Sequence, residues 1–252
     1  MHACLERMAK QVVFLTNDAR GNCFVKAYLQ NMGFMNRIHY QTVYSSGFYF
    51  NQYMNELILH GDFRFYHLKH CFIDDPRRIN DIKNNFDIEF VSQYSQANYC
   101  LCTGKLVPEY INSDELKASM NTLLQALKAH QLIMLCPNPD AIVLDHNNQP
   151  QYMAGLIADQ YEAMGGQVLY FGKPKPYPYE FILKKFKPKR PLMIGDNLNT
   201  DIMGAHALGI DTLLVKSGVS YFEYLQSDQT QDFAEWVANQ NYQVDWCIDS
   251  LK

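Results

Sequence analysis

The stretch LMIGDNLNTDIMGAHALG, Leu192–Gly209, runs from an apolar strand pattern into two carboxylates and then into a helix pattern. Asp196 directly follows the strand pattern, and Asp201 stands where the helix pattern begins. Ligands of parallel α/β sheets bind at the carboxyl ends of the strands, so acids at that position point to a function. Because Mg²⁺ prefers oxygen ligands, the pair predicts half of a magnesium site. The competing interpretation is a pair of acids at a helix N-terminus, which fits Asp201 well and Asp196 poorly.

Two further strand patterns end in polar residues. Thr16 and Asn17 close the pattern VVFL, where a hydroxyl and backbone N–H groups suit a phosphate oxygen. Taken alone, this pair is better explained as a helix cap. Lys173, in FGKPKP, can neutralise phosphate or carboxylate charge, although the tripeptide GKP alone is typical of a loop.

Composition excludes several classes of protein. The chain has 252 residues, of which 48% are apolar and 19% charged, and its formal net charge is −4. No basic field favours nucleic acid, no polybasic or long apolar segment favours a membrane, and no secretory signal is recognised, so a cytoplasmic protein is expected. The seven scattered cysteines favour reduced, buried thiols.

One alternative metal site remains open in the sequence. His67, His70 and Cys71 lie close together in HLKHC, and Cys100 and Cys102 form a second pair. Zinc sites normally require two clear ligand pairs, so this hypothesis is weaker than the strand-end site.

The order of patterns predicts an α/β fold. Short apolar runs alternate with helix patterns over residues 1–61 and 172–252, which favours parallel βαβ units. Residues 62–171 differ, with polar connections and a helix expected over about 113–130 that Asn112 and Glu115 would cap. The sequence therefore predicts a core domain formed by residues 1–61 and 172–252, with residues 62–171 inserted as a separate module.

In chain order, VVFLTN, TVYSSG, CPNPD, YFGKPKP, MIGDNLNTDIMGAHALGIDTLLVKSG and VDWCIDSL resemble the haloacid dehalogenase (HAD) superfamily, subfamily IIA, the group of NagD-type and pyridoxal-phosphate phosphatases. The resemblance implies a Rossmann-like core at 1–61 and 172–252 and an α/β cap of the C2 type at 62–171. It also implies Mg²⁺-dependent hydrolysis of a small phosphorylated metabolite. It leaves a monomer and a homodimer both open.

The resemblance assigns roles to the strand-end residues. Thr16 and Asn17 would hold the transferring phosphoryl group, and Lys173 would steady the charge of a phosphoaspartate. Asp196 would bind the metal directly, and Asp201 through water or from the second shell. Positioning and charge neutralisation are what phosphoryl transfer requires of a protein.

The cap would supply the substrate contacts, and Asn138 and Asp140 of the NPD stretch are the weaker candidates for them.

The family's first motif, D-x-D-G, carries the nucleophile, and it does not occur in these 252 residues. We therefore expect no turnover from this chain, weak Mg²⁺ binding, and a coding sequence that begins upstream of Met1. Asp18 is the nearest substitute acid. The strand of Phe14 and that of Met193 should face each other across a gap, which would indicate a fragment, or pair directly. The alternative is a non-catalytic protein that binds phosphate ligands or a partner.

Overall fold

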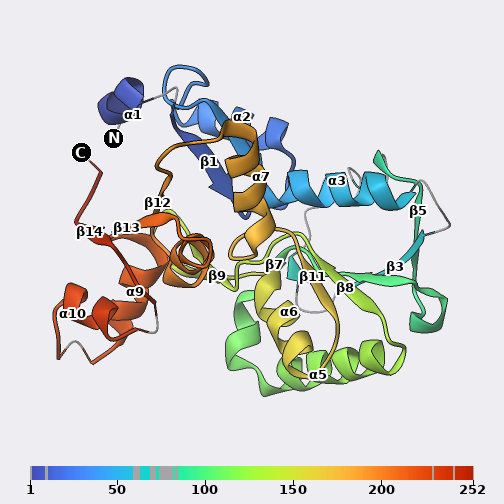
Figure 1. Ribbon diagram of the computed structural model, residues 1–252. Helices are drawn as coiled ribbons and strands as arrows, with labels where there is room; N and C mark the ends of the chain where they lie inside the picture. Colours follow the sequence, from blue (N-terminus) through green and yellow to red (C-terminus); the bar gives the residue numbers. More distant parts are fainter. Residues whose placement is uncertain are drawn as a thin grey trace.

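The computed structural model describes residues 2–8, 11–58, 63–68, 72–73, 82, 85–228, 230–240 and 242–251. Its architecture is α/β, as predicted, with three separate parallel sheets and helices packed against them (Figure 1). No described helix is both long enough and apolar enough to cross a membrane.

The first parallel pair is built from the N-terminal part of the chain. Helix α1 (His2–Met8) precedes β1 (Val13–Thr16), and α2 (Asn22–Asn31) connects β1 to β2 (Thr42–Ser45). Val13 pairs with Thr42 and Thr16 with Ser45, so both strands end at the same edge. Helix α3 (Ser46–Ile58) begins directly after β2.

The C-terminal part forms a three-stranded parallel sheet in the order β12-β13-β14. Its strands are β12 (Leu192–Gly195), β13 (Asp211–Val215) and β14 (Trp246–Ile248). A π-helical turn (Leu198–Ile202) and α8 (Met203–His206) follow β12, while α9 (Gly218–Gln226) and α10 (Phe233–Ala238) lie between β13 and β14.

A five-stranded parallel sheet occupies the middle of the chain, in the order β11-β8-β6-β3-β5. Its strands are β3 (Phe63–His67), β5 (Ile88–Val91), β6 (Tyr99–Leu101), β8 (Ile133–Cys136) and β11 (Val168–Tyr170). Two antiparallel pairs accompany it, β4 (Phe72–Ile73) with β7 (Lys105–Leu106) and β9 (Ile142–Leu144) with β10 (Pro150–Tyr152). The remaining helices are α5 (Asp114–Ala129), α6 (Ala154–Ala163) and α7 (Pro176–Phe186), and 3₁₀ turns cover Tyr94–Gln96 and Pro108–Asn112.

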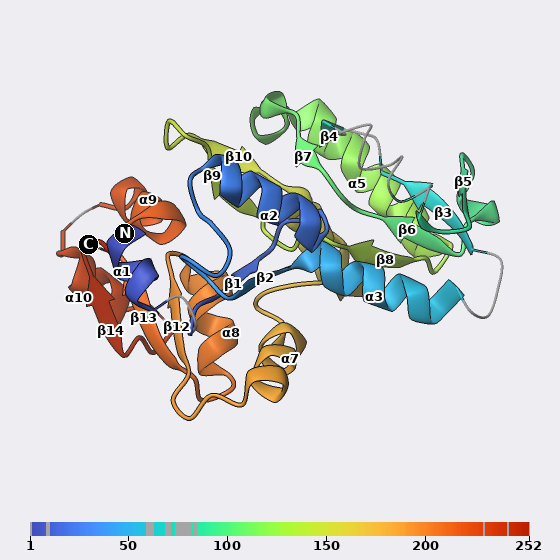
Figure 2. The ribbon, with the colours of Figure 1, turned by 90° about the horizontal axis from the view of Figure 1, so that it is seen from above.

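Both faces of the five-stranded sheet are covered. Helices α5 and α6 pack on one face, where Leu124 and Ile157 join Met134 in the largest apolar cluster. Helix α3 covers the other face with Phe50 and Met54 (Figure 2). This double burial explains why the inner strands β6 and β8 are short apolar runs, YCL and IMLC. The division into a core at 1–61 and 172–252 and a cap at 62–171 stays a prediction, and α3 packs on the sheet of the inserted region.

The strand of Phe14 and the strand of Met193 are not hydrogen-bonded to each other. Strand β1 pairs only with β2, and β12 only with β13, among the described residues. Of the two arrangements expected, direct pairing is wrong, and each strand keeps one open edge. Leu192 is 45% exposed and Ile194 37%, which is unusual in a parallel sheet, where strands are normally buried.

Most elements agree with the sequence-based expectations, and two details differ. The helix expected over 113–130 spans Asp114–Ala129, but its cap is Ser113, whose side chain accepts a hydrogen bond from the Leu116 N–H, rather than Asn112. Asn112 instead ends the preceding 3₁₀ turn. The run IHYQTVYSS, residues 38–46, predicts a strand from Ile38, but the strand begins only at Thr42, because residues 37–39 form a turn.

Candidate functional site

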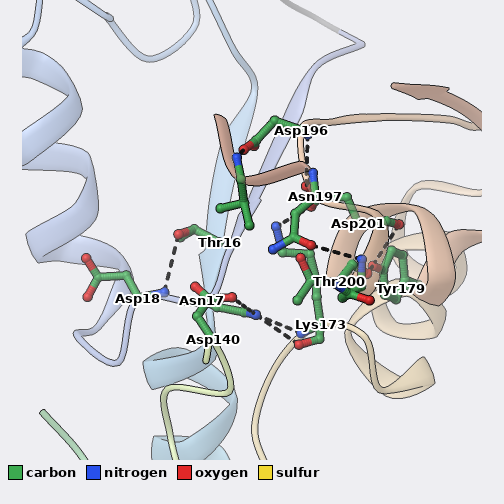
Figure 3. A network of polar contacts seen from close by, with 12 residues as sticks. Thr16, Asn17, Asp18, Asp140, Lys173, Tyr179, Asp196, Asn197, Thr200 and Asp201 are labelled. Atoms are coloured by element: carbon green, nitrogen blue, oxygen red, sulfur yellow. Dashed lines mark hydrogen bonds and ion pairs between the residues drawn. The ribbon is translucent and has the colours of Figure 1, made fainter. Parts of the chain in front are cut away.

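Polar side chains from four separate segments meet at the carboxyl ends of β1 and β12 (Figure 3). The segments are the turn after β1, the loop after β8, the turn after β11 and the turn after β12. Hydrogen bonds join the Asn17 side chain to the backbone of Lys173, Lys173 Nζ to Asp201, and the Asp201 carboxylate to the backbone N–H of Asp196. The roles of these residues stay proposals.

Asn17 is the connecting residue of the network, and its side chain is buried. Its amide nitrogen donates to Asp140 Oδ1 at 2.8 Å and to the backbone oxygen of Lys173 at 2.9 Å. Its amide oxygen accepts the backbone N–H of Lys173 at 2.7 Å. The Asn17 side chain is therefore fully used in fixing the backbone of Lys173 and the carboxylate of Asp140.

Gly172 makes this close approach possible. A Cβ added at Gly172 would lie 2.3 Å from Asn17 Oδ1 and 2.9 Å from a ring carbon of Pro139. Any other residue would push the turn after β11 away from Asn17. The sequence FGKP therefore places Lys173 where a larger residue before it could not.

Lys173 and Asp201 form a buried ion pair. Lys173 Nζ lies 2.5 Å from Asp201 Oδ1, and the two side chains are 11% and 6% exposed. Burial alone would lower the pKa of Lys173, but Asp201, Asp140 and Asp196 together outweigh it and raise the pKa. The second carboxylate oxygen, Asp201 Oδ2, accepts the backbone N–H groups of Asp196 and Asn197, both at 3.2 Å. Asp201 thus fixes both the ammonium and the turn after β12.

Asp196 is held at the N-terminus of α9. Its Oδ2 accepts the N–H of Val219 at 3.0 Å, and its backbone oxygen accepts the N–H of Ser220 at 3.1 Å. Burial, then the charge of Asp201, raises the pKa of Asp196. Asp196 therefore does lie at a helix N-terminus, as one interpretation of the sequence suggests. The helix is α9, however, and not the helix that follows β12.

Gly218 is required for that contact. Its φ of +60° favours glycine, and an added Cβ would lie 1.8 Å from Asp196 Oδ2. Gly218 and Ser220 are functional residues that the sequence patterns did not reveal. The Ser220 hydroxyl oxygen accepts the N–H of Leu198 at 2.8 Å. The signal was the polar end of a further strand pattern, KSG after DTLLV, at the same edge of the sheet.

Asp140 lies opposite Lys173 on the Asn17 side chain. The residue keeps some exposure, but protein atoms enclose its carboxyl group, and this burial raises its pKa to about 6. Lys173 and Asn17 oppose the increase, while Asp201 and Asp196 add to it. The N–H of Gly155 donates to the Asp140 backbone oxygen at 3.1 Å and anchors the loop.

Asn138 is not part of this network. It is 4% exposed, and its Oδ1 has no hydrogen-bond partner among the described residues. Its backbone oxygen accepts a hydrogen bond from the Cys136 thiol. The side chain thus has an unused buried acceptor beside the Asp140 loop.

Thr16 and Asp18 lie on the β1 side of the site (Figure 3). Thr16 Oγ1 accepts the N–H of Asp18 at 3.3 Å. The interpretation of Thr16 and Asn17 as a helix cap is wrong, because the N-cap of α2 is Gly21 and no side chain caps that helix. The Asp18 carboxylate pairs with the Arg20 guanidinium through both oxygens. Asp18 is thus occupied by a cation, and its expected role as substitute metal ligand is not supported.

The donor set fits a divalent cation only in part. Among the described residues, no three His, Cys, Asp or Glu side chains come together in a group that could hold a metal ion. Asp201 is occupied by Lys173 and two N–H groups, so Asp196 is the carboxylate that can give an oxygen directly. One carboxylate is only part of an Mg²⁺ site, because the other ligands are a second carboxylate, substrate oxygens or water.

The alternative zinc site falls partly outside the described residues, which include His67 but not His70 or Cys71. Cys100 and Cys102 are both fully buried in the largest apolar cluster. Burial, followed by the neighbouring Cys136, raises the pKa of both thiols. Because metal binding needs thiolates, this environment favours the buried-thiol interpretation for these two cysteines.

Comparisons with known families agree with the motifs. Residues 52–209 match the model of the haloacid dehalogenase-like hydrolases, and residues 170–251 match the HAD-hydrolase-like model. Human Chronophin is 46% identical over 74 residues, 29% of this chain and 25% of that protein. Glycerol-3-phosphate phosphatase of Gallus gallus is 34% identical over 87 residues, 34% of this chain and 27% of that protein.

The ribonucleotide monophosphatase NagD of Escherichia coli is 37% identical over 74 residues, 29% of this chain and 30% of that protein. The matched segments thus span about a quarter to a third of these curated relatives. Among solved structures, a haloacid dehalogenase-like hydrolase from Brucella suis superposes with a TM-score of 0.74 at 26% identity, over 99% of this chain and 88% of that one. A p-nitrophenyl phosphatase from Archaeoglobus fulgidus shares the fold, with a TM-score of 0.61 at 17% identity over 94% of this chain and 83% of that one.

Proposed function

Because this chain belongs to the haloacid dehalogenase-like hydrolases, in subfamily IIA with its Chronophin and NagD relatives, we propose that its site serves phosphomonoester hydrolysis. The proposed substrate class is a small phosphorylated metabolite. The observation that carries the proposal is the buried Lys173 at the ends of β1 and β12: its ammonium pairs with Asp201, and its backbone is fixed by the Asn17 side chain. A fixed, desolvated cation at strand ends suits a phosphoryl group.

The contacts of each residue refine its proposed role. Thr16 Oγ1 accepts from Asp18, which leaves the hydroxyl proton free to be donated to a phosphoryl oxygen. The side chain of Asn17 is spent on Lys173 and Asp140, so we assign it a positioning role. Lys173 supplies the positive charge against which the phosphoryl oxygens bind.

We assign the direct contact with Mg²⁺ to Asp196. In this family Mg²⁺ supplies charge neutralisation for the phosphoryl oxygens, and Asp196 would give it one carboxylate oxygen. Asp201, occupied by Lys173, would act on it only through water or through the Asp196 backbone. Mg²⁺ binding by this chain is accordingly expected to be weak.

We expect these 252 residues alone not to hydrolyse a phosphomonoester. They contain no D-x-D-G, and the three acids around Lys173 are all engaged in hydrogen bonds. Without a carboxylate nucleophile no phosphoaspartate forms. The open edges of β1 and β12 are where the family resemblance would put a strand that carries it. The second candidate function, non-catalytic binding of a phosphate ligand or a partner, rests on the same observation.

The test combines turnover with binding. With para-nitrophenyl phosphate and Mg²⁺ we expect only trace hydrolysis, while inorganic phosphate should bind measurably in ³¹P NMR titrations. Thr16→Val and Lys173→Met should weaken that binding, and Lys184→Met, on the exposed last turn of α7, should leave it unchanged. Circular dichroism of each variant controls for folding.

The outcomes separate the parts of the proposal. Robust turnover that Asp196→Asn abolishes would overturn the inactivity and retain the phosphatase. Phosphate binding without turnover, lost in Thr16→Val, supports the proposal as stated. If phosphate neither binds nor is released, the site does not serve phosphate chemistry in this chain.

A further inference from the structure

A second concave site is lined by residues of α3, of β11 and of the turn and helix α7 that follow it. These elements are labelled in Figure 1. The site has a volume of about 640 Å³, within the range of small-molecule sites. None of its lining residues belongs to the hydrogen-bonded network of Asn17, Lys173, Asp196 and Asp201. The proposed phosphohydrolase function leaves this pocket unexplained.

The walls of the pocket are aromatic rings from all three elements. The rings that line it are Tyr49, Tyr53, Tyr170, Phe171, Tyr177 and Phe181. Two pairs pack edge-to-face, with ring centroids of Tyr49 and Tyr177 5.3 Å apart and those of Tyr49 and Phe181 5.6 Å apart, and Tyr53 packs tilted against Phe171. Such walls offer both edges and faces to an inserted ring.

The tyrosine hydroxyls are turned to protein partners. Tyr49 Oη donates to the backbone oxygen of Pro178, Tyr177 Oη to that of Tyr170, and Tyr170 Oη to Asp159. Burial is the main cause that raises the pKa of each of these phenols, so they stay neutral and add no negative charge. The walls therefore act mainly through their rings.

The polar residues that line the pocket are one cation, one anion and one amide. Lys175 Nζ lies 4.6 Å from the centroid of the Tyr170 ring, a cation–π contact that holds the ammonium at the pocket. Glu56, on the last turn of α3, supplies a carboxylate, and Gln52 lies one turn before it. A ligand that matches this set carries an aromatic ring with both an anionic and a cationic group.

We propose that this pocket binds a small aromatic zwitterion of the aromatic α-amino acid class. The ring lies among the tyrosines and phenylalanines, the carboxylate faces Lys175, and the ammonium faces Glu56. Aromatic contact provides most of the affinity, because each ion pair is partly exposed to water and contributes little. The two charges decide which aromatic compounds are selected.

The experiment uses four probes that differ by one feature. L-Tryptophan has ring, carboxylate and ammonium; indole-3-propionate lacks the ammonium, tryptamine lacks the carboxylate, and L-alanine lacks the ring. Saturation-transfer NMR and calorimetric titration of the full chain should show tryptophan binding most tightly, each singly charged indole about threefold to fivefold more weakly, and alanine not at all.

Charge-removing variants then assign each end of the ligand. Lys175→Gln should weaken tryptophan and indole-3-propionate binding about threefold to fivefold but leave tryptamine unchanged, and Glu56→Gln should do the reverse. Tyr53→Ala should weaken all three indole probes about tenfold. The matched controls are Lys184→Gln and Glu180→Gln, on helix α7, whose N-cap is Lys175, but outside the pocket.

Each possible result either supports or contradicts the proposed aromatic ligand. The crossed pattern of the two charge variants with unchanged controls supports the proposal. Equal binding of all indole probes, equal effects in pocket and control variants, or no binding of tryptophan at millimolar concentration would overturn it. Phosphate titrations of the same variants should be unaffected, so a failure here is distinguishable from a failure of the proposed phosphate site.

Discussion

Replacing Asp140 by asparagine should stabilise the protein at neutral and alkaline pH. The enclosed carboxyl group has its pKa raised from the ordinary 3.8 to about 6, chiefly by burial. The folded protein therefore binds this proton more tightly than the unfolded chain, and stability falls as the pH rises from about 4 through about 6. Asp140→Asn keeps an acceptor for the Asn17 amide and removes the charge that must be desolvated.

From this pKa difference, ionisation of Asp140 lowers the free energy of unfolding by about 3 kcal/mol at pH 8 and by about half of that at pH 5. Asp140 keeps some solvent contact, so we expect a gain of about 1 to 3 kcal/mol at pH 8. Urea unfolding from pH 5 to 8 measures it. The control is Asp145, in the turn between β9 and β10, whose pKa the backbone N–H groups of Gln149 and Asn147 lower, so Asp145→Asn should lose relative stability as the pH rises. A variant of Asp140 no more stable than wild type at pH 8, or one whose advantage is independent of pH, would refute the reasoning.

Three further predictions use the same unfolding assay. Gly218→Ala should lower the free energy of unfolding by more than about 2 kcal/mol, because the added Cβ would lie 1.8 Å from a carboxylate oxygen of Asp196. The control Gly209→Ala, at a φ of +66° in open space, should lower it by only about 1 kcal/mol. Equal losses in the two variants would contradict the steric argument. Lys173→Met should destabilise by about 3 to 5 kcal/mol, because it leaves the Asp201 carboxylate buried without its cation, and a loss below about 1 kcal/mol would mean that the pair is not formed. Ser113→Ala should cost about 1 kcal/mol through the lost cap of α5, and no loss would mean that Ser113 does not cap this helix.

The strand-end residues were found from the sequence because parallel sheets gather the carboxyl ends of their strands at one edge. Asn17, Lys173, Asp196 and Asp201 stand at or just after such ends, and that topology brings them within hydrogen-bonding distance of one another. The family was also readable, because its motifs occur in order within one chain. The substrate could not be predicted from the sequence, because it depends on the conformation of loops that local sequence patterns do not determine.

The amino-acid sequence by itself determined the α/β class, the order of the elements and the residue types at the strand ends, because hydrophobic periodicity and turn residues are local properties. Only the tertiary structure decided how those residues divide their work. Asp201 takes the ammonium, Asp196 takes the N-terminus of α9, Asp18 turns to Arg20, and Asn17 spends its amide on Asp140, 123 residues away. A carboxylate can accept from any nearby donor, so its partner is set by distances between segments that are remote in sequence. The open edges of β1 and β12 are likewise a property of how two sheets sit together, which neither strand's residues encode.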